Sequence, residues 1–135
     1  ASDVYKRQGR PGILVTPHLG ASTAESEENC AEMAVDQLMN YLENGNIVNS
    51  VNYPNCDLGE ANCAARITVH HKNLPNMIGQ LTAILAADGH NISNMLNKSK
   101  GEWAYSMFDM EKKAPTEETI KKMEQIDGVV RVRVL

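Results

Sequence analysis

Two polar side chains, His71 and Asn73, lie between a predicted strand and a predicted helix, where they could bind a small ligand. Residues 66–71 alternate between two faces in the pattern of a half-buried strand. Apolar residues then recur at helical spacing, with Pro75 suited to the first helical position and Gly89 to a left-handed stop. Because a helix start has unpaired backbone N–H groups, it attracts a small carboxylate. The alternative is a turn without a ligand, since Asn and Pro are ordinary turn residues.

His18 is the second candidate for chemistry, because an imidazole that is neutral near pH 7 can act as a general acid or base. It lies in the loop 16–23, between a short apolar run and an acidic helix start. The apolar run, residues 13–15, predicts a buried strand. Ser22 and Glu25 have the spacing of a capping box. A histidine in such a loop can equally be a loop residue without a catalytic role.

A long helix is predicted from residue 22 to about residue 43. Its apolar face is wide and needs partners on more than one side. The residues of this face are Cys30, Met33, Ala34, Leu38, Tyr41 and Leu42, widened by Ala31, Val35 and Met39. Asn44 and Gly45 end the helix. Residues 45–54 then predict a return strand or loop, and the polar stretch that follows has no periodicity, as in a linker.

The second half of the chain predicts a small α+β domain. Residues 91–99 and 103–110 predict a hairpin, 116–125 a helix and 129–135 a final strand. With the strand at 66–71 and its helix, the order is a ferredoxin-like βαββαβ. Right-handed crossovers place both helices on one face of the sheet. The other face and the edge strands stay open, which favours a homodimer or a larger homo-oligomer.

Composition excludes several classes of function. The chain has 135 residues, with 42% hydrophobic and 22% charged residues, which is ordinary for a soluble globular protein. The net charge of −4 without a basic cluster argues against nucleic acid as a partner. No apolar run is long enough to span a bilayer, and we expect no signal peptide. The cysteines are Cys30, Cys56 and Cys63, without metal-site spacing, so we expect reduced thiols, no metal site and a cytoplasmic protein.

The second half resembles an ACT domain, the small regulatory module of amino-acid metabolism. The pattern that carries the resemblance is His71-x-Asn73-x-Pro75, a helix, and then Gly89-x-Asn91-Ile92. The resemblance covers residues 65–135. It implies that His71 and Asn73 contact an amino-acid effector, L-serine, and that Asn91 serves the site of the partner subunit. One position departs from the pattern: Asn76 stands where many serine-binding members carry glycine, which adopts unusual backbone angles more freely.

The loop around His18 resembles the end of the catalytic region of D-2-hydroxyacid dehydrogenases. The matching stretch is Thr-Pro-His-Leu-Gly-Ala-Ser-Thr at 16–23, preceded by an apolar run and followed by an acidic helix start. The resemblance implies that His18 takes the proton from the substrate hydroxyl while a hydride passes to NAD. It also implies that Gly20 and Ala21 lie near the nicotinamide. The fold class is therefore a ferredoxin-like domain preceded by a strand, loop and long helix of an α/β dehydrogenase.

Other parts of a dehydrogenase site are missing from the sequence. It contains no Gly-x-Gly-x-x-Gly, the motif whose backbone holds the phosphates of NAD. It also lacks the family's substrate-binding arginine and the acidic partner of the histidine. A lone histidine cannot replace the positioning and charge complementarity of a complete site. We therefore expect this chain alone to be inactive as an oxidoreductase.

The predicted organisation has four parts. Residues 1–10 are a junction segment, 11–54 the end of a dehydrogenase catalytic region, 55–64 a linker and 65–135 the ACT domain. Two alternatives remain open. The chain could be a non-catalytic amino-acid-binding module, or a dimerisation domain without a ligand.

Overall fold

The computed structural model describes residues 9–17 and 19–135, and the chain divides into two compact units, Ala1–Ala34 and Val35–Leu135. Each unit is described by itself. His18, the predicted general acid or base, lies outside the described residues.

The buried strand predicted at 13–15 is not formed. These residues have no strand conformation, and the side chains of Ile13 and Leu14 are 44% and 87% exposed. A strand is stable only when its backbone pairs with neighbouring strands and its side chains pack on a core. No described residue pairs with this segment, so the prediction of a buried strand is wrong for this chain.

Helix α2 (Ala24–Asn44) begins one residue later than the spacing of Ser22 and Glu25 predicts. Thr23 caps it, because its Oγ1 accepts a hydrogen bond from the Ser26 N–H at 3.2 Å. Serine and threonine are both good N-caps, so sequence alone cannot choose between neighbours. The helix ends at Asn44, as predicted, before Gly45 with φ of 71°. Several apolar side chains of α2 remain exposed: Met33, Val35, Leu38, Met39 and Leu42.

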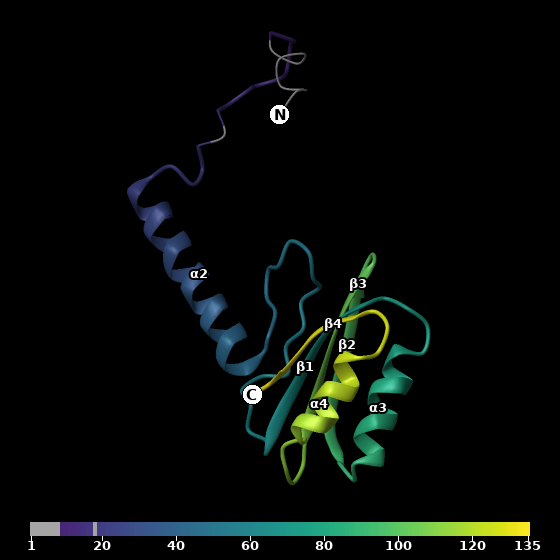
Figure 1. The fold of residues 1–135 in the computed structure, drawn as a ribbon. Helices are drawn as coiled ribbons and strands as arrows, with labels where there is room; N and C mark the ends of the chain where they lie inside the picture. The colour runs from purple at the N-terminus through teal and green to yellow at the C-terminus, as the bar shows by residue number, and fades with distance from the viewer. Residues whose placement is uncertain (1–8, 18) are drawn as a thin grey trace. The chain divides into compact units, whose positions relative to one another are not determined.

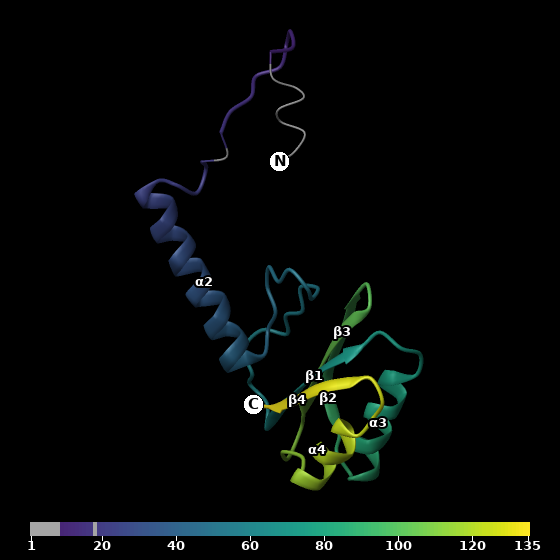
Figure 2. The same ribbon diagram turned by 45° about the horizontal axis from the view of Figure 1, so that its top comes forward.

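The second unit contains the predicted βαββαβ domain. Its four antiparallel strands lie in the order β2-β3-β1-β4, the order of a ferredoxin-like sheet, so this prediction is confirmed. Figures 1 and 2 show α3 and α4 side by side on one face of the sheet. The elements are β1 (Ala65–Lys72), α3 (Met77–Ala87), β2 (Ile92–Lys100), β3 (Trp103–Met110), α4 (Glu117–Glu124) and β4 (Val129–Val134).

An apolar core lies between these helices and the sheet. Leu81 and Leu85 of α3 and Met123 of α4 pack against the strands, and all three are completely buried. The strand residues of this core are Ala65, Ile67, Val69, Phe108, Met110 and Val132. Burying one large apolar side chain contributes roughly 1.5–3 kcal/mol, so this face supplies much of the stability of the domain.

The opposite face of the sheet, which was expected to stay open, is also covered, so that prediction is wrong. Ile47, Cys56, Tyr105 and Met107 form a second core, and Tyr41 of α2 packs against it. Both faces of β1 are therefore buried, including the side chains of Arg66, Thr68 and His71. The prediction of a half-buried strand is wrong, because Arg66 and Thr68 are buried on the side of the second core and do not face water.

Two local features depart from a regular pattern. The pairing of β2 with β3 shifts between Ile92 and Asn94. This bulge turns Ile92 toward the helix-face core and Leu96 toward the second core. Pro75 does not begin α3, because Asn76 with φ of 63° interrupts the chain before the helix starts at Met77. Gly89 has φ of 72° and ends that helix region as predicted.

No helix within the described ranges is both long enough and apolar enough to cross a bilayer.

Candidate functional site

The loop between β1 and α3 is anchored to the turn between β2 and β3. The backbone N–H of Asn73 donates to the carbonyl of Glu102 at 2.8 Å, and its side-chain Nδ2 donates to the carbonyl of Gly101 at 3.2 Å. Asn73 is exposed. The predicted effector residue therefore lies at an accessible place with a fixed backbone.

The start of α3 has no side-chain cap. Asn76 holds the left-handed conformation, with φ of 63° and ψ of 13°, and its side chain makes no capping hydrogen bond to the helix. The first N–H groups of α3 are thus free of a side-chain cap and carry the positive end of the helix dipole. The Asn76 side chain instead lies close to Gly79, where a Cβ would meet its Oδ1.

His71 is buried and its ring atoms are engaged within the domain. Nδ1 lies 2.8 Å from the Lys72 carbonyl, and Nε2 lies 2.8 Å from Ser106 Oγ. Since a carbonyl can only accept, Nδ1 carries a proton and donates it to the Lys72 carbonyl. Ser106 Oγ in turn donates its own proton to Asn97 Oδ1 at 3.0 Å. His71 therefore stabilises the loop through contacts inside the domain. Asn73 and the N–H groups at the start of α3 are the groups that a ligand can reach.

Asn91 lies at the other end of the sheet. It precedes Ile92, which pairs with Met110, whereas Lys72 beside the loop pairs with Trp103. Seven residue steps along β3 separate these pairs, a distance of roughly 23 Å. Asn91 donates through Nδ2 to the carboxylate of Glu111. Within one chain, the structure brings His71 and Asn73 together and leaves Asn91 apart.

The residues predicted near the nicotinamide, Gly20 and Ala21, lie in an exposed turn of the first unit. A Cβ added at Gly20 would meet no atom within 4 Å. Their place beside a nicotinamide stays a prediction.

The segment 55–64, expected to link two domains, is held firmly against the sheet. Arg66 is buried and donates through Nε to Asp109 Oδ1 at 2.6 Å and through Nη2 to Asp109 Oδ2 at 3.0 Å. Its Nη1 also donates to the carbonyls of Asn44 at 2.9 Å and Gly59 at 2.8 Å. One guanidinium thus joins the end of α2, this segment and the sheet.

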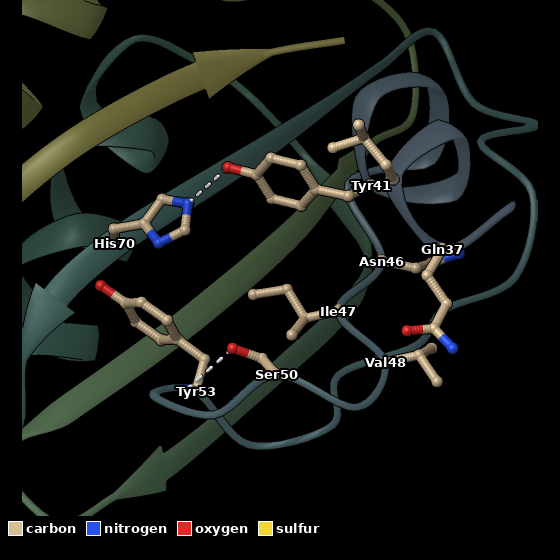
Figure 3. Close-up of a pocket in the computed structure, with 9 residues that line it drawn as sticks. Gln37, Tyr41, Asn46, Ile47, Val48, Ser50, Tyr53 and His70 are labelled. Carbon is tan, nitrogen blue, oxygen red and sulfur yellow. Dashed lines mark hydrogen bonds between the residues drawn. The ribbon is translucent and has the colours of Figure 1, made fainter. Parts of the chain in front are cut away.

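A cleft that sequence reasoning missed lies beside this junction (Figure 3). Its volume is about 400 Å³, and the end of α2, the loop 46–53 and β1 line it. Tyr41 Oη lies 3.0 Å from His70 Nε2, and the rings of Tyr53 and His70 meet edge to face with centroids 4.9 Å apart. Because its residues come from three segments, no spacing in the sequence could reveal it.

The imidazole in this cleft stays neutral at pH 7. Burial, together with the nearby positive charges of Arg133 and Arg131, lowers the pKa of His70 to about 4. Arg133 lies over the Tyr41 ring, 4.6 Å from its centroid, and donates to the carbonyls of Tyr41 and Leu42. These last carbonyls of α2 attract a cation, so Arg133 also fastens the helix end.

Comparisons with known proteins point to one group of relatives, although no family model matches the chain. D-3-phosphoglycerate dehydrogenase of Haemophilus influenzae is 31% identical over 123 residues, which cover 91% of this chain and 30% of that protein. D-3-phosphoglycerate dehydrogenase 2 of Saccharomyces cerevisiae is 32% identical over 131 residues, which cover 93% of this chain and 28% of that protein. The chain thus spans about 30% of the length of the curated relatives it matches.

Solved structures that are similar to this chain include regulatory domains. The ACT domain from GTP pyrophosphokinase of Chlorobium tepidum has 20% identity and a TM-score of 0.44, covering 53% of this chain and 95% of that one. The regulatory subunit of aspartate kinase from Thermus thermophilus has 14% identity and a TM-score of 0.45, covering 54% and 50%. Over nine-tenths of its own length, the chain corresponds to the C-terminal part of D-3-phosphoglycerate dehydrogenases.

Proposed function

We propose that this chain is the C-terminal, regulatory part of an NAD-dependent D-3-phosphoglycerate dehydrogenase of the cytoplasm. The parent enzyme would oxidise 3-phosphoglycerate in the first step of L-serine biosynthesis, with His18 as its general acid or base. The observation that carries the proposal is the similarity to these dehydrogenases over 91% of the chain. The chain alone would be inactive, so NAD reduction by the purified chain with 3-phosphoglycerate would contradict this part of the proposal.

The regulatory ligand in this proposal is L-serine, bound at the loop between β1 and α3. Its carboxylate would accept hydrogen bonds from the uncapped N–H groups that follow Asn76. Its polar groups would meet the exposed side chain of Asn73, while Asn91 would contribute to the site of the partner subunit. If the coupling to the catalytic region follows typical allostery, it amounts to roughly 1–3 kcal/mol.

Calorimetric titration of L-serine into the chain tests this ligand, with glycine and D-serine as controls. The sharpest variant is Asn73→Ala, because this side chain is exposed and its removal leaves the core intact. Asn52→Ala is the matched control, since Asn52 is also an exposed asparagine in a loop. We expect binding of L-serine by the wild type and Asn52→Ala, and loss of binding in Asn73→Ala. His71→Ala should also lose binding, but with a loss of stability.

The second candidate is a dimerisation domain without a ligand. It is favoured by the internal hydrogen bonds of His71, which leave that ring without a free atom for an effector. It is also favoured by exposed apolar side chains on the edge strands, with Val130 of β4 and Met95 of β2 exposed by 59% and 49%. A folded dimer in sedimentation that binds no L-serine would support this candidate over the first.

A further inference from the structure

The cleft of about 400 Å³ beside His70 is separate from the effector loop and lies entirely within the second unit. His70 and His71 are neighbours in β1, but their side chains point to opposite faces of the sheet. His71 contacts Ser106 on the helix face, whereas His70 contacts Tyr41 and the ring of Tyr105 on the other face. The volume falls in the range of small-molecule sites.

The lining of the cleft carries no formal charge at pH 7. It consists of aliphatic residues, two amides, one serine, two tyrosines and His70, whose surroundings keep it neutral. Two cations near the cleft are already engaged: Arg133 with two backbone carbonyls and the Tyr41 ring, and Lys100 with the Val51 carbonyl at 3.0 Å. A carboxylate or phosphate would leave water here without gaining a counter-charge from the lining itself, which is costly. The cleft therefore favours an uncharged ligand.

The arrangement of rings favours an aromatic ligand. Tyr53 and Tyr41 both stand edge to face with His70, at interplanar angles of 78° and 66°. Such pairs are favourable beyond their buried area, and a further ring can extend the same pattern. Leu38, Ile47 and Val48 add aliphatic side chains to the lining of the cleft.

One polar group in the lining can orient such a ligand. Ser50 Oγ accepts a hydrogen bond from the Tyr53 N–H at 3.2 Å, which leaves its own proton for a ligand oxygen. We propose that this cleft is a second ligand site, which binds an uncharged aromatic molecule bearing one hydroxyl group, as a phenol does. The ring would lie beside Tyr41, Tyr53 and His70, with its hydroxyl at Ser50.

Titration of the chain with para-cresol, followed by amide and imidazole NMR shifts, tests this site. We expect saturable shifts confined to residues 46–53, the end of α2 and His70. The charged analogue para-hydroxybenzoate has a similar ring and should bind at least about tenfold more weakly. Equal affinity for the two compounds, or shifts that spread over the surface without saturating, would overturn the proposal.

Two substitutions of valine by phenylalanine provide a matched pair. Val48→Phe places a ring inside the cleft and should lower the affinity for para-cresol at least about tenfold. Val51→Phe adds the same ring at a position that is 87% exposed and outside the lining, so affinity should be unchanged. Unchanged affinity in Val48→Phe would sink the proposal.

A gentler variant guards against misfolding of Val48→Phe. Leu38 lines the cleft but is 57% exposed, so Leu38→Ala removes one wall without opening the core. We expect its affinity for para-cresol to fall about threefold. This is a smaller loss of binding free energy than the roughly 1.4 kcal/mol of a tenfold change. A folded Leu38→Ala chain with wild-type affinity would contradict the site. Leu38→Ala should bind L-serine as the wild type does. A change in para-cresol affinity in this variant therefore reports on the cleft and not on the effector loop.

Discussion

The two faces of the sheet are built in different ways. The face under α3 and α4 is an apolar core of leucine, isoleucine, valine, phenylalanine and methionine side chains. The opposite face combines a smaller apolar cluster with the buried pair of Arg66 and Asp109 and the ring of His70. The first face is mainly apolar packing, with His71 and Ser106 as a buried polar contact, whereas the second face also contains a buried ion pair.

This difference suggests different tasks for the two faces. An apolar core tolerates many exchanges of similar volume, so it stabilises the domain without demanding one arrangement. A buried ion pair contributes little net stability over apolar replacements, but removal of one partner is costly. The polar face therefore fixes where the end of α2 and the segment 55–64 attach to the sheet.

The largest effect is expected from Asp109→Ala. This change leaves the Arg66 guanidinium buried without its carboxylate, and we expect a loss of about 3–5 kcal/mol in the free energy of unfolding. Chemical denaturation measures this loss. Replacement of both residues, Arg66→Met with Asp109→Leu, should restore most of the stability. A double variant as unstable as Asp109→Ala would show that the ion pair is needed for stability itself.

Leu85→Ala tests the helix face in the same assay. Leu85 is completely buried between α3 and the sheet, so its truncation removes apolar contacts and leaves a cavity. We expect a loss of about 3 kcal/mol. The amide shifts of residues 46–53 should change little, since they belong to the other face. Large shift changes in residues 46–53 would show that the two faces of the sheet are not independent.

The elements of the helix face could be predicted well from the sequence. The bounds of β3 matched at both ends, and α4 lies within the range predicted from its amphipathic pattern. Local periodicity carries this information, because one buried face produces one regular pattern. The strand at 13–15 was not formed because a strand depends on partners that local pattern does not contain.

The second face could not be predicted for a different reason. Arg66, Thr68 and His70 alternate with apolar residues, and this pattern is the same whether their side chains meet water or a second core. Only the pairing of Arg66 with Asp109, 43 positions away, distinguishes the two cases. In the effector loop, His71 and Asn73 could be placed from the sequence, but the inward hydrogen bonds of His71 depend on Ser106 of another strand.

The stability of the polar face should depend on pH through His70. Its pKa in the folded chain is about 4, below the ordinary value of 6.5, so the unfolded chain binds more protons between these values. Stability is therefore complete above about pH 6.5 and falls as the pH approaches 4. Because the ring is partly exposed, we expect a loss of roughly 1–2 kcal/mol.

His70→Phe isolates this contribution from other titrating groups. The difference in unfolding free energy between the wild type and His70→Phe, measured from pH 7 to pH 4, should shrink or reverse as the pH falls. A difference that stays constant across this range would mean that His70 is not held neutral by the second face.

The smallest effect is expected at Asn76, where the effector loop meets α3. Its φ of 63° is strained for a residue with a side chain, so Asn76→Gly should raise stability by about 0.5–1 kcal/mol. The change also removes the side chain that lies close to Gly79, which opens the N–H groups at the start of α3. Calorimetry should then show tighter binding of L-serine. Asn76→Val is the opposing control, because a β-branched residue at positive φ should lower both stability and affinity. If Asn76→Gly gains stability without any gain in affinity, the backbone at this turn serves the fold and not a ligand.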